Sequence, residues 1–288
     1  MVRKVIFNAD DYGSCAEINA AIKELIEAGR LSDVSVLVTG RMWESSTAFL
    51  LKHPQVSAGV HLNAVEGQPV SASSEIRWIT NADGQFPGLG GPRGLIARWI
   101  RHPLAVTRAV ELEWRAQIER LYAVGLHLSH ADSHQHLHAF PPAWHCAVKL
   151  CREYNIPSLR LPLEKNSLPL RRGGALALGA SLFVAKLAAS LDRDGDNDGK
   201  RLRHNDHFLG FKRAGAYGLK ELIADLRIAS PGVTEVALHP STQDKSPYPG
   251  LLGNRERLAL LDASLPNQLA AMGIEITTWK NIGKDITG

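Results

Sequence analysis

The stretch VRKVIFNADDYGSCAEINAAIKELIEAG (residues 2–29) contains a complete strand–turn–helix unit. Residues 2–8 form a short run rich in Val, Ile and Phe that predicts a strand, and acidic residues and a glycine end it. Residues 16–28 carry apolar side chains at positions 18, 21, 22, 25 and 26, the spacing of an amphipathic helix. This unit predicts an α/β protein in which polar side chains follow a buried strand.

The same alternation continues along the chain. Strands are predicted at residues 2–8, 34–39, 58–62, 126–131, 158–161, 235–239 and 274–279. Helices are predicted at residues 16–28, 45–52, 106–122, 142–154, 175–191, 219–229 and 255–272. Strands that alternate with helices indicate βαβ units and a parallel sheet. About seven such strands favour an irregular, TIM-like (β/α) barrel, and the sequence contains neither of the glycine-rich nucleotide-binding fingerprints.

Composition fits one large soluble domain. The 288 residues are 44% hydrophobic and 22% charged with a net charge of +4, which excludes a disordered or fibrous chain. No internal repeat or long linker divides the chain, so residues 1–288 are expected to form a single domain with loop insertions near 64–95 and 192–207. Three cysteines cannot form a disulfide framework, which favours the reducing cytoplasm.

Two classes of partner are not expected. No apolar run is long enough for a signal-peptide core or a transmembrane segment. The basic residues are scattered and not interleaved with aromatic side chains, so no nucleic-acid partner is predicted. The apolar residues 175–191 are interpreted as a buried or amphipathic helix, with peripheral contact to lipid or an apolar substrate as the alternative.

An acidic segment, residues 192–199, resembles the start of a calcium-binding loop of the EF-hand type. Position twelve of that loop would be Asn205, where a bidentate glutamate is required. The segment is therefore interpreted as a solvated acidic loop, and incidental calcium binding remains the alternative.

A barrel gathers its chemistry at the carboxyl ends of its strands. Four predicted strands deliver aspartate or histidine at that end, and these residues are Asp10, Asp11, His61, Asp132, His134 and His239. Taken singly, each has an ordinary structural explanation: the aspartate pair could cap the following helix, and His61 could be a buried strand-end residue. The occurrence of Asp or His at the same end of four predicted strands favours a functional site.

The segment His130–His138 is the most informative part of this set. Its even positions carry His, Asp, His, His and His, so an extended chain would point all five side chains the same way. Imidazoles and carboxylates are the usual ligands of zinc and related divalent ions. Five residues cannot all bind one ion, so one or two are expected to be ligands and the others to contact the ligands or the substrate.

One aspartate with two histidines leaves coordination positions open for water and substrate, as catalytic rather than structural metal sites do. The sequence also offers a second carboxylate to act as general base and a further histidine to act as general acid. A hydrolase that binds one divalent metal ion, zinc or magnesium, is therefore predicted.

Five motifs occur in an order that resembles the YdjC/ChbG/HpnK family of carbohydrate deacetylases. They are NADDYG (8–13), GVHLNAVEGQPV (59–70), HADSHQHLHAFPP (130–142), RLP (160–162) and EVALHP (235–240). The resemblance runs from residue 3 to about residue 245. It implies an irregular (β/α) barrel that forms a homodimer and removes an N-acetyl group from an amino sugar with a divalent metal.

The resemblance also implies roles for individual residues. Asp10 would be the base that deprotonates a metal-activated water, His239 the acid that protonates the departing amine, and Arg160 a support for the Asp10 carboxylate. Acetate would be released. The metal ligands would be Asp11, His61 and His134. Contacts to the substrate or to these ligands would come from Asn63, Glu66, Asp132, His136 and His138.

The substrate remains open between two kinds of acetylated sugar. Tyr12 stands where the family usually has Phe, a conservative change. The segment NDHFLGF (205–211) resembles the hopanoid-associated branch, whereas the pattern at 132–136 departs from that branch. The substrate is thus a chito-oligosaccharide-like sugar or a sugar-lipid. Two other functions are kept as alternatives: a metal-dependent phosphoesterase, and a non-catalytic sugar-binding barrel with a vestigial metal site.

Overall fold

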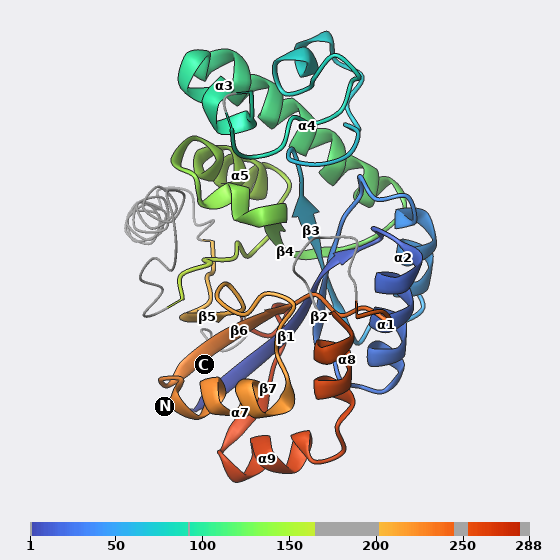
Figure 1. The fold of residues 1–288 in the computed structure, drawn as a ribbon, viewed down its shortest axis with the longest axis vertical. Helices are drawn as coiled ribbons and strands as arrows, with labels where there is room; N and C mark the ends of the chain where they lie inside the picture. The colour runs from blue at the N-terminus through green and yellow to red at the C-terminus, as the bar shows by residue number, and fades with distance from the viewer. Residues whose placement is uncertain (1, 92, 165–201, 245–252, 283–288) are drawn as a thin grey trace.

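A computed structural model describes residues 2–91, 93–164, 202–244 and 253–282 (Figure 1). The predicted apolar helix at 175–191 and the acidic segment at 192–199 lie outside these described residues, so both remain predictions.

A parallel sheet forms the centre of the molecule. Its strands are β1 (Arg3–Tyr12), β2 (Asp33–Val36), β3 (Ser57–Leu62), β4 (Leu128–Ser133), β5 (His207–Leu209), β6 (Gly232–Leu238) and β7 (Ile274–Ile276). They lie in the order β4-β3-β2-β1-β6-β5, and β7 pairs with the first residues of β1. Every pairing is parallel. The central strands are buried on both faces because helices cover the outside.

Two isolated parallel bridges connect the ends of this sheet. Ala131 of β4 pairs with Leu159, and Ser158 pairs with Arg203, four residues before β5 begins. Backbone hydrogen bonds support both bridges, including one of 2.9 Å from the Leu159 N–H to the Arg203 carbonyl. The sheet is therefore an irregular (β/α) barrel, and the predicted fold class is confirmed.

The helices surround the strands, as Figure 1 shows. They are α1 (Ala16–Glu27), α2 (Trp43–Leu50), α3 (Leu95–Arg101), α4 (Pro103–Ala123), α5 (Pro141–Glu153), α7 (Leu219–Ile228), α8 (Gly253–Leu261) and α9 (Leu265–Ala271). Two short 3₁₀ helices, η1 (Ser74–Trp78) and η2 (His134–Ala139), lie in loops. The insertion that precedes α4 contains η1 and α3, and it lies beyond the carboxyl end of β3.

Two predicted elements differ from the structure. The helix predicted over residues 255–272 is two helices, because the chain turns at residues 262–264 and Pro266 occupies the first turn of α9. The strand predicted at 158–161 makes only isolated bridges, and the short strand β5 was not predicted. Within the described ranges, no helix is long and apolar enough to cross a membrane.

Candidate active site

The carboxyl end of β1 turns sharply and presents two carboxylates. Asp11 has a positive φ of 62°, and the pairing between β1 and β2 shifts register between Ala9 and Tyr12. This irregularity lets the adjacent side chains of Asp10 and Asp11 serve one site, which a regular strand would point to opposite faces. The structural alternative for the pair is wrong, since the residue that precedes α1 as its N-cap is Cys15.

Asp11 lies against two histidines, His61 on β3 and His134 directly after β4. Its Oδ1 atom is 2.9 Å from Nδ1 of His134 and 3.4 Å from Nε2 of His61. All three side chains are buried. Burial alone would raise the pKa of Asp11, but His134 and His61 together hold it well below its usual range. Their potential ligand atoms all lie within 4.8 Å of one another, so this group could hold a metal ion.

Asp132 fixes the orientation of the His61 ring. Its Oδ1 atom is 2.7 Å from Nδ1 of His61, and its Oδ2 atom accepts a 2.7 Å hydrogen bond from the Ser35 hydroxyl. With Nδ1 directed to this carboxylate, Nε2 of His61 is the nitrogen that faces Asp11. A carboxylate behind a histidine in this way is typical of metal sites. The donor set of one carboxylate and two imidazoles, in which Asp132 orients the His61 ring, therefore fits a divalent ion.

Arg160 lies at the centre of a second set of carboxylates. Its Nη1 and Nη2 atoms donate to the two oxygens of Asp10 at 2.7 Å each, and Nη2 also lies 2.6 Å from Oδ2 of Asp132. Asp10, His61 and Asp132 could geometrically hold an ion as well. A fully buried guanidinium between both of these carboxylates opposes a second cation there. The group around Asp11 is consequently the better metal site.

His239 completes the cluster at the end of β6. Its Nε2 atom lies 3.9 Å from Oδ2 of Asp10, and its side chain is 15% exposed. Burial lowers the pKa of His239, although Asp10 and Asp11 act in the opposite direction. Among the described residues, its Nδ1 atom has no hydrogen-bond partner. The imidazole can therefore gain or lose a proton next to the Asp10 carboxylate.

The predicted extended run from His130 to His138 is wrong beyond Ser133. Strand β4 ends there, and Gln135 and His136 both have positive φ inside η2. The Ser133 hydroxyl oxygen accepts a 2.8 Å hydrogen bond from the His138 backbone N–H, which stabilises this turn. The side chains of the run therefore point to different places.

His130 and His138 have structural partners on both ring nitrogens. His130 lies between the hydroxyls of Ser35 and Ser129 and stacks on Trp279 with ring centroids 5.4 Å apart. His138 lies between the Ser133 hydroxyl and the Arg160 carbonyl. Burial lowers the pKa of His130 to about 3 and that of His138 to about 4. Both rings are thus neutral supports of the site.

His136 is placed differently. Its ring packs edge-on against Phe208, with centroids 5.4 Å apart, and next to Phe211. Burial, followed by the positive charge of Arg160, lowers the pKa of His136 well below its usual range. Within the described part of the chain its Nδ1 atom has no partner. A strained, neutral and partly exposed imidazole beside the cluster is suited to contact a substrate.

Asn63 and Glu66 belong to the loop after β3. Among the described residues, the Asn63 side chain bonds to Thr39 and to backbone atoms of its own loop, namely the N–H groups of Val65 and Glu66 and the Glu66 carbonyl. It therefore holds the loop in place. Glu66 is about half exposed, accepts a 2.6 Å hydrogen bond from Gln135, and lies 3.7 Å from Nε2 of His134. This carboxylate stands at the outer edge of the cluster.

Four residues of the site were not predicted from the sequence. Asn8 donates to Asp10 at 2.7 Å, and Ser35 bonds to Asp132. Glu235 accepts a 3.0 Å hydrogen bond from Nε of Arg160, and burial raises its pKa to about 7. Glu256 on α8 accepts the backbone N–H of His239 at 2.6 Å. Asn8 and Glu235 lie within the quoted motifs, whereas nothing near Ser35 or Glu256 in the sequence indicates a role.

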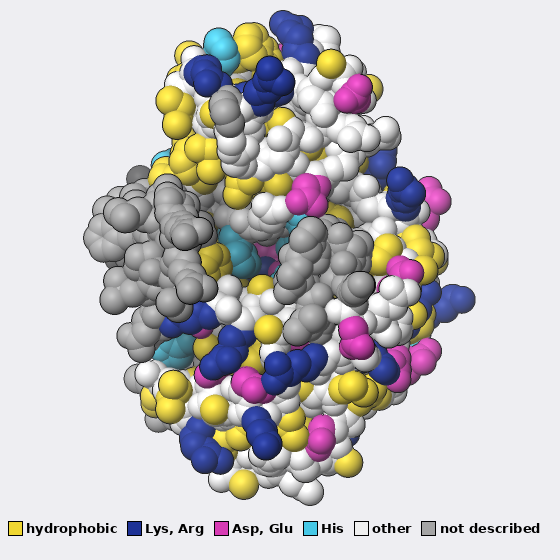
Figure 2. All heavy atoms as spheres, in the orientation of Figure 1, with side chains coloured by type: hydrophobic (Ala, Val, Ile, Leu, Met, Phe, Trp, Pro, Cys, Tyr) yellow, Lys and Arg dark blue, Asp and Glu magenta, His cyan; other side chains and the backbone are white. Residues whose placement is uncertain are grey.

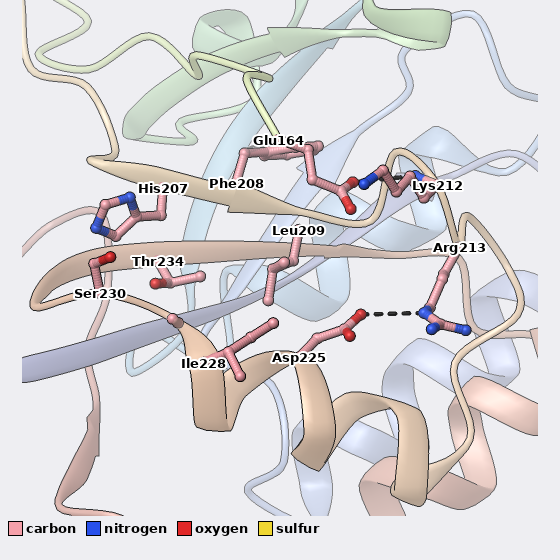
Figure 3. A pocket seen from close by; sticks show the side chains of 11 residues that line it. Glu164, His207, Phe208, Leu209, Lys212, Arg213, Asp225, Ile228, Ser230 and Thr234 are labelled. Carbon is pink, nitrogen blue, oxygen red and sulfur yellow. Dashed lines mark hydrogen bonds and ion pairs between the residues drawn. The ribbon is translucent and has the colours of Figure 1, made fainter. Parts of the chain in front are cut away.

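The site lies at the base of an open depression. Figure 2 shows histidine and acidic side chains at the bottom of a hollow in the centre of this face. A separate cavity of about 250 Å³ lies between β5, β6 and α7, where Arg213 and Asp225 form an ion pair across its rim (Figure 3). None of the predicted site residues lines this second cavity, so it is distinct from the cluster described above.

Comparisons with known proteins find a family and relatives that are similar to this chain. The family described as YdjC-like protein matches residues 4–271. A carbohydrate deacetylase of Brevibacillus brevis is 34% identical over 154 residues, which are 54% of this chain and 58% of that protein. A carbohydrate deacetylase of Mus musculus is 26% identical over 262 residues, or 86% of this chain and 81% of that protein. The match thus spans only about three fifths of the Brevibacillus relative's length.

A solved structure shares the fold. It is that of a protein from Enterococcus faecalis V583 named for cellobiose-phosphate cleavage, with a TM-score of 0.72 over 98% of this chain and 99% of that chain. The two sequences are 20% identical, so the likeness concerns the barrel alone.

Proposed function

The chain belongs to the YdjC-like protein family, and we propose that it is a metal-dependent hydrolase that removes the N-acetyl group of an amino sugar. The observation that carries this proposal is the meeting of Asp10, Asp11, His61, His134 and His239 at one end of the barrel. The names of the relatives support a carbohydrate as the substrate. Three cysteines without a disulfide agree with a cytoplasmic location.

Asp11, His61 and His134 would hold the metal, with zinc and magnesium as the candidates. A divalent ion supplies Lewis-acid chemistry: it polarises a carbonyl oxygen and makes a nearby water more acidic. Asp132 maintains the donor set by holding the His61 ring through Nδ1. Three protein ligands would leave a coordination position for a substrate oxygen, as catalytic sites require.

Asp10 would take the proton of the attacking water. Both of its oxygens accept hydrogen bonds from Arg160, and Oδ1 accepts another from Asn8, so its position is fixed. The guanidinium stabilises the negative charge of the carboxylate until the proton is taken up. A positioned base that is held in this way is expected to contribute about 10²- to 10⁴-fold in rate.

His239 would return a proton to the departing amine. Because burial lowers its pKa, the resting imidazole is neutral and must first gain a proton. Asp10, which holds the proton taken from water, lies 3.9 Å away and can supply it after a small movement. The bond between carbonyl carbon and nitrogen then breaks, which leaves acetate and a free amino sugar.

The phosphoesterase alternative has less support. A two-metal phosphate clamp needs two ions side by side. The second set of candidate ligands, around Asp10 and Asp132, already contains the buried guanidinium of Arg160. One ion is therefore the arrangement that the charges favour.

Acetate release tests the proposal directly. The substrates are N-acetylated chito-oligosaccharides and acetylated sugar-lipids, each assayed with a chelator and after zinc or magnesium is restored. Acetate should appear only with metal, and Asp10→Asn should lose about 10²- to 10⁴-fold in turnover. The exposed substitution Asp83→Asn is the matched control and should leave turnover unchanged.

Metal binding is measured separately by the rise in melting temperature on adding the ion. Asp10→Asn should keep this rise and Asp11→Asn should lose it. Near-normal turnover by Asp10→Asn would overturn the assignment of the base. Sugar binding without acetate release under any metal would instead favour the non-catalytic barrel.

A further inference from the structure

One stretch of the insertion after β3 is basic without any acidic residue. From Gly84 to Val110 the chain has no Asp or Glu, and it contains Arg93, Arg98, Arg101 and Arg108. Arg98 and Arg101 lie on α3, and Arg93 precedes that helix. Arg108 lies on α4 and pairs with Glu75 at 3.3 Å.

Two large apolar side chains are exposed in the middle of this basic stretch. Ile100 is 74% exposed and Leu104 is 86% exposed, and all five residues from 100 to 104 are exposed. The other large, exposed apolar side chains of the described residues lie on other segments: Val2, Leu51, Ile228, Leu258 and Ile276. Single exposed apolar residues are ordinary on soluble proteins, but a pair within one basic corner is not explained by chance exposure.

Hydrogen bonds connect the two helices of this corner. Trp99 is buried, and its Nε1–H donates a 2.8 Å hydrogen bond to the Thr107 hydroxyl, which connects α3 to α4. The Arg98 side chain donates to backbone carbonyls of Arg93 and Thr80.

The corner lies at one end of the molecule. Figure 1 shows α3 and the start of α4 beyond the carboxyl end of β3, on the side of the barrel mouth. Figure 2 shows Lys or Arg side chains and hydrophobic side chains together at that end. The first turn of α4 contains no acidic residue. The positive end of the α4 helix dipole therefore adds to the positive charge of the arginines.

Apolar side chains next to arginines match the interface of an anionic lipid bilayer. Apolar side chains enter the boundary between headgroups and acyl chains, while guanidinium groups remain among the phosphates. A nucleic acid would satisfy the arginines but would leave Ile100 and Leu104 unburied. We propose that the corner Ile100–Leu104 docks the protein on an anionic membrane surface, with the barrel mouth on the docked side.

Sedimentation with lipid vesicles tests this docking. The probes are vesicles of phosphatidylcholine alone and of phosphatidylcholine mixed with phosphatidylglycerol. The protein should sediment only with the mixed vesicles. The double variant Ile100→Ser/Leu104→Ser should bind roughly 10-fold more weakly, because two apolar anchors are lost. The variant Arg93→Gln/Arg101→Gln should lose about fivefold for each arginine.

A matched pair controls for general loss of apolar surface. Ile228→Ser/Leu258→Ser removes two exposed apolar side chains from α7 and α8 and should bind as the unaltered protein does. All of these positions are exposed, so unaltered melting temperatures should show that the variants fold. Failure of the unaltered protein to bind anionic vesicles would overturn the proposal. So would equal losses in the control pair and the corner pair. Docking is measured without substrate, so its outcome is independent of the proposed activity.

Discussion

Both terminal nitrogens of Arg160 donate to the carboxylate of Asp10, and each distance is 2.7 Å. The same guanidinium contacts Asp132 at 2.6 Å and donates from Nε to Glu235 at 3.0 Å. One buried cation thus links carboxylates at three strands of the barrel. Its fork-like geometry matches a carboxylate in a way that a single ammonium group cannot.

Arg160→Lys is therefore expected to impair both turnover and stability. Lysine retains the charge but loses the bidentate contact, so the Asp10 carboxylate is no longer fixed and kcat should fall by roughly 10-fold or more. Arg160→Met, which leaves the carboxylates without a cation, should lower the free energy of unfolding by about 3–5 kcal/mol. Urea denaturation and steady-state kinetics measure the two effects.

Arg115→Lys is the matched control for that substitution. Arg115 also pairs with a carboxylate, Glu153, but at the surface, where such a pair contributes about 0–1 kcal/mol. A variant Arg160→Lys that keeps full turnover and stability would show that the fork is not required.

Asp132→Asn is expected to weaken metal binding without removing a ligand. Asp132 orients His61 through Nδ1, and loss of such support typically costs 10- to 100-fold in metal affinity. Calorimetric titration with zinc measures the change, and Asp83→Asn serves as the control. Thermal unfolding of the metal-free proteins reveals any loss of fold that arises from the lost contact with Arg160. An unchanged zinc affinity would contradict the assigned role of Asp132.

The sequence predicted most of the barrel because its strands and helices have strong local patterns. Residues 2–29 show this, since a buried strand and an amphipathic helix follow each other directly. The short strand β5 has three residues and depends on its pairing with β6, so no local pattern indicates it. The division between α8 and α9 depends on one turn near Pro266, which periodicity alone does not resolve.

The candidate site was predictable where its residues end strands. Asp11, His61 and His134 meet as the barrel topology requires. The side-chain directions after Ser133 were not predictable, because two positive φ angles reverse the alternation that an extended chain would have. Glu256 was also missed, since it contacts the His239 backbone from a helix that is distant in sequence.

Gly59→Ala is expected to destabilise the barrel. A Cβ atom at this position would lie 2.3 Å from Nε2 of His130, which is buried and stacked on Trp279. Overpacking of this kind costs about 1–3 kcal/mol. Urea denaturation measures the loss.

Combining Gly59→Ala with His130→Ala tests whether the His130 ring causes this loss of stability. With the ring absent, the added methyl group should cost markedly less, which a double-mutant cycle measures. Gly90→Ala is the control, since nothing lies within 4 Å of a Cβ atom there. Equal costs of Gly59→Ala in both backgrounds would show that His130 is not the neighbour responsible.

Asp33→Asn is expected to stabilise the protein above neutral pH. Asp33 is buried at the start of β2, and burial raises its pKa from 3.8 to about 7 although the Trp279 backbone N–H donates to Oδ1 at 3.0 Å. Between these two values the folded protein retains a proton that the unfolded chain has lost. Stability therefore falls as the pH rises to about 7 and is constant above it, at about 1.4 kcal/mol per pH unit within that window.

Asparagine keeps the acceptor for the Trp279 N–H and has no proton to lose. The stability of Asp33→Asn relative to the unaltered protein should therefore increase by about 2 kcal/mol or more between about pH 5 and about pH 7, and then remain constant. Urea denaturation at a series of pH values measures this difference. The exposed substitution Asp83→Asn is the control for this series. A flat difference for Asp33→Asn as well would mean that this carboxylate is ionised in the folded protein, and that its charge is stabilised by contacts other than the Trp279 hydrogen bond.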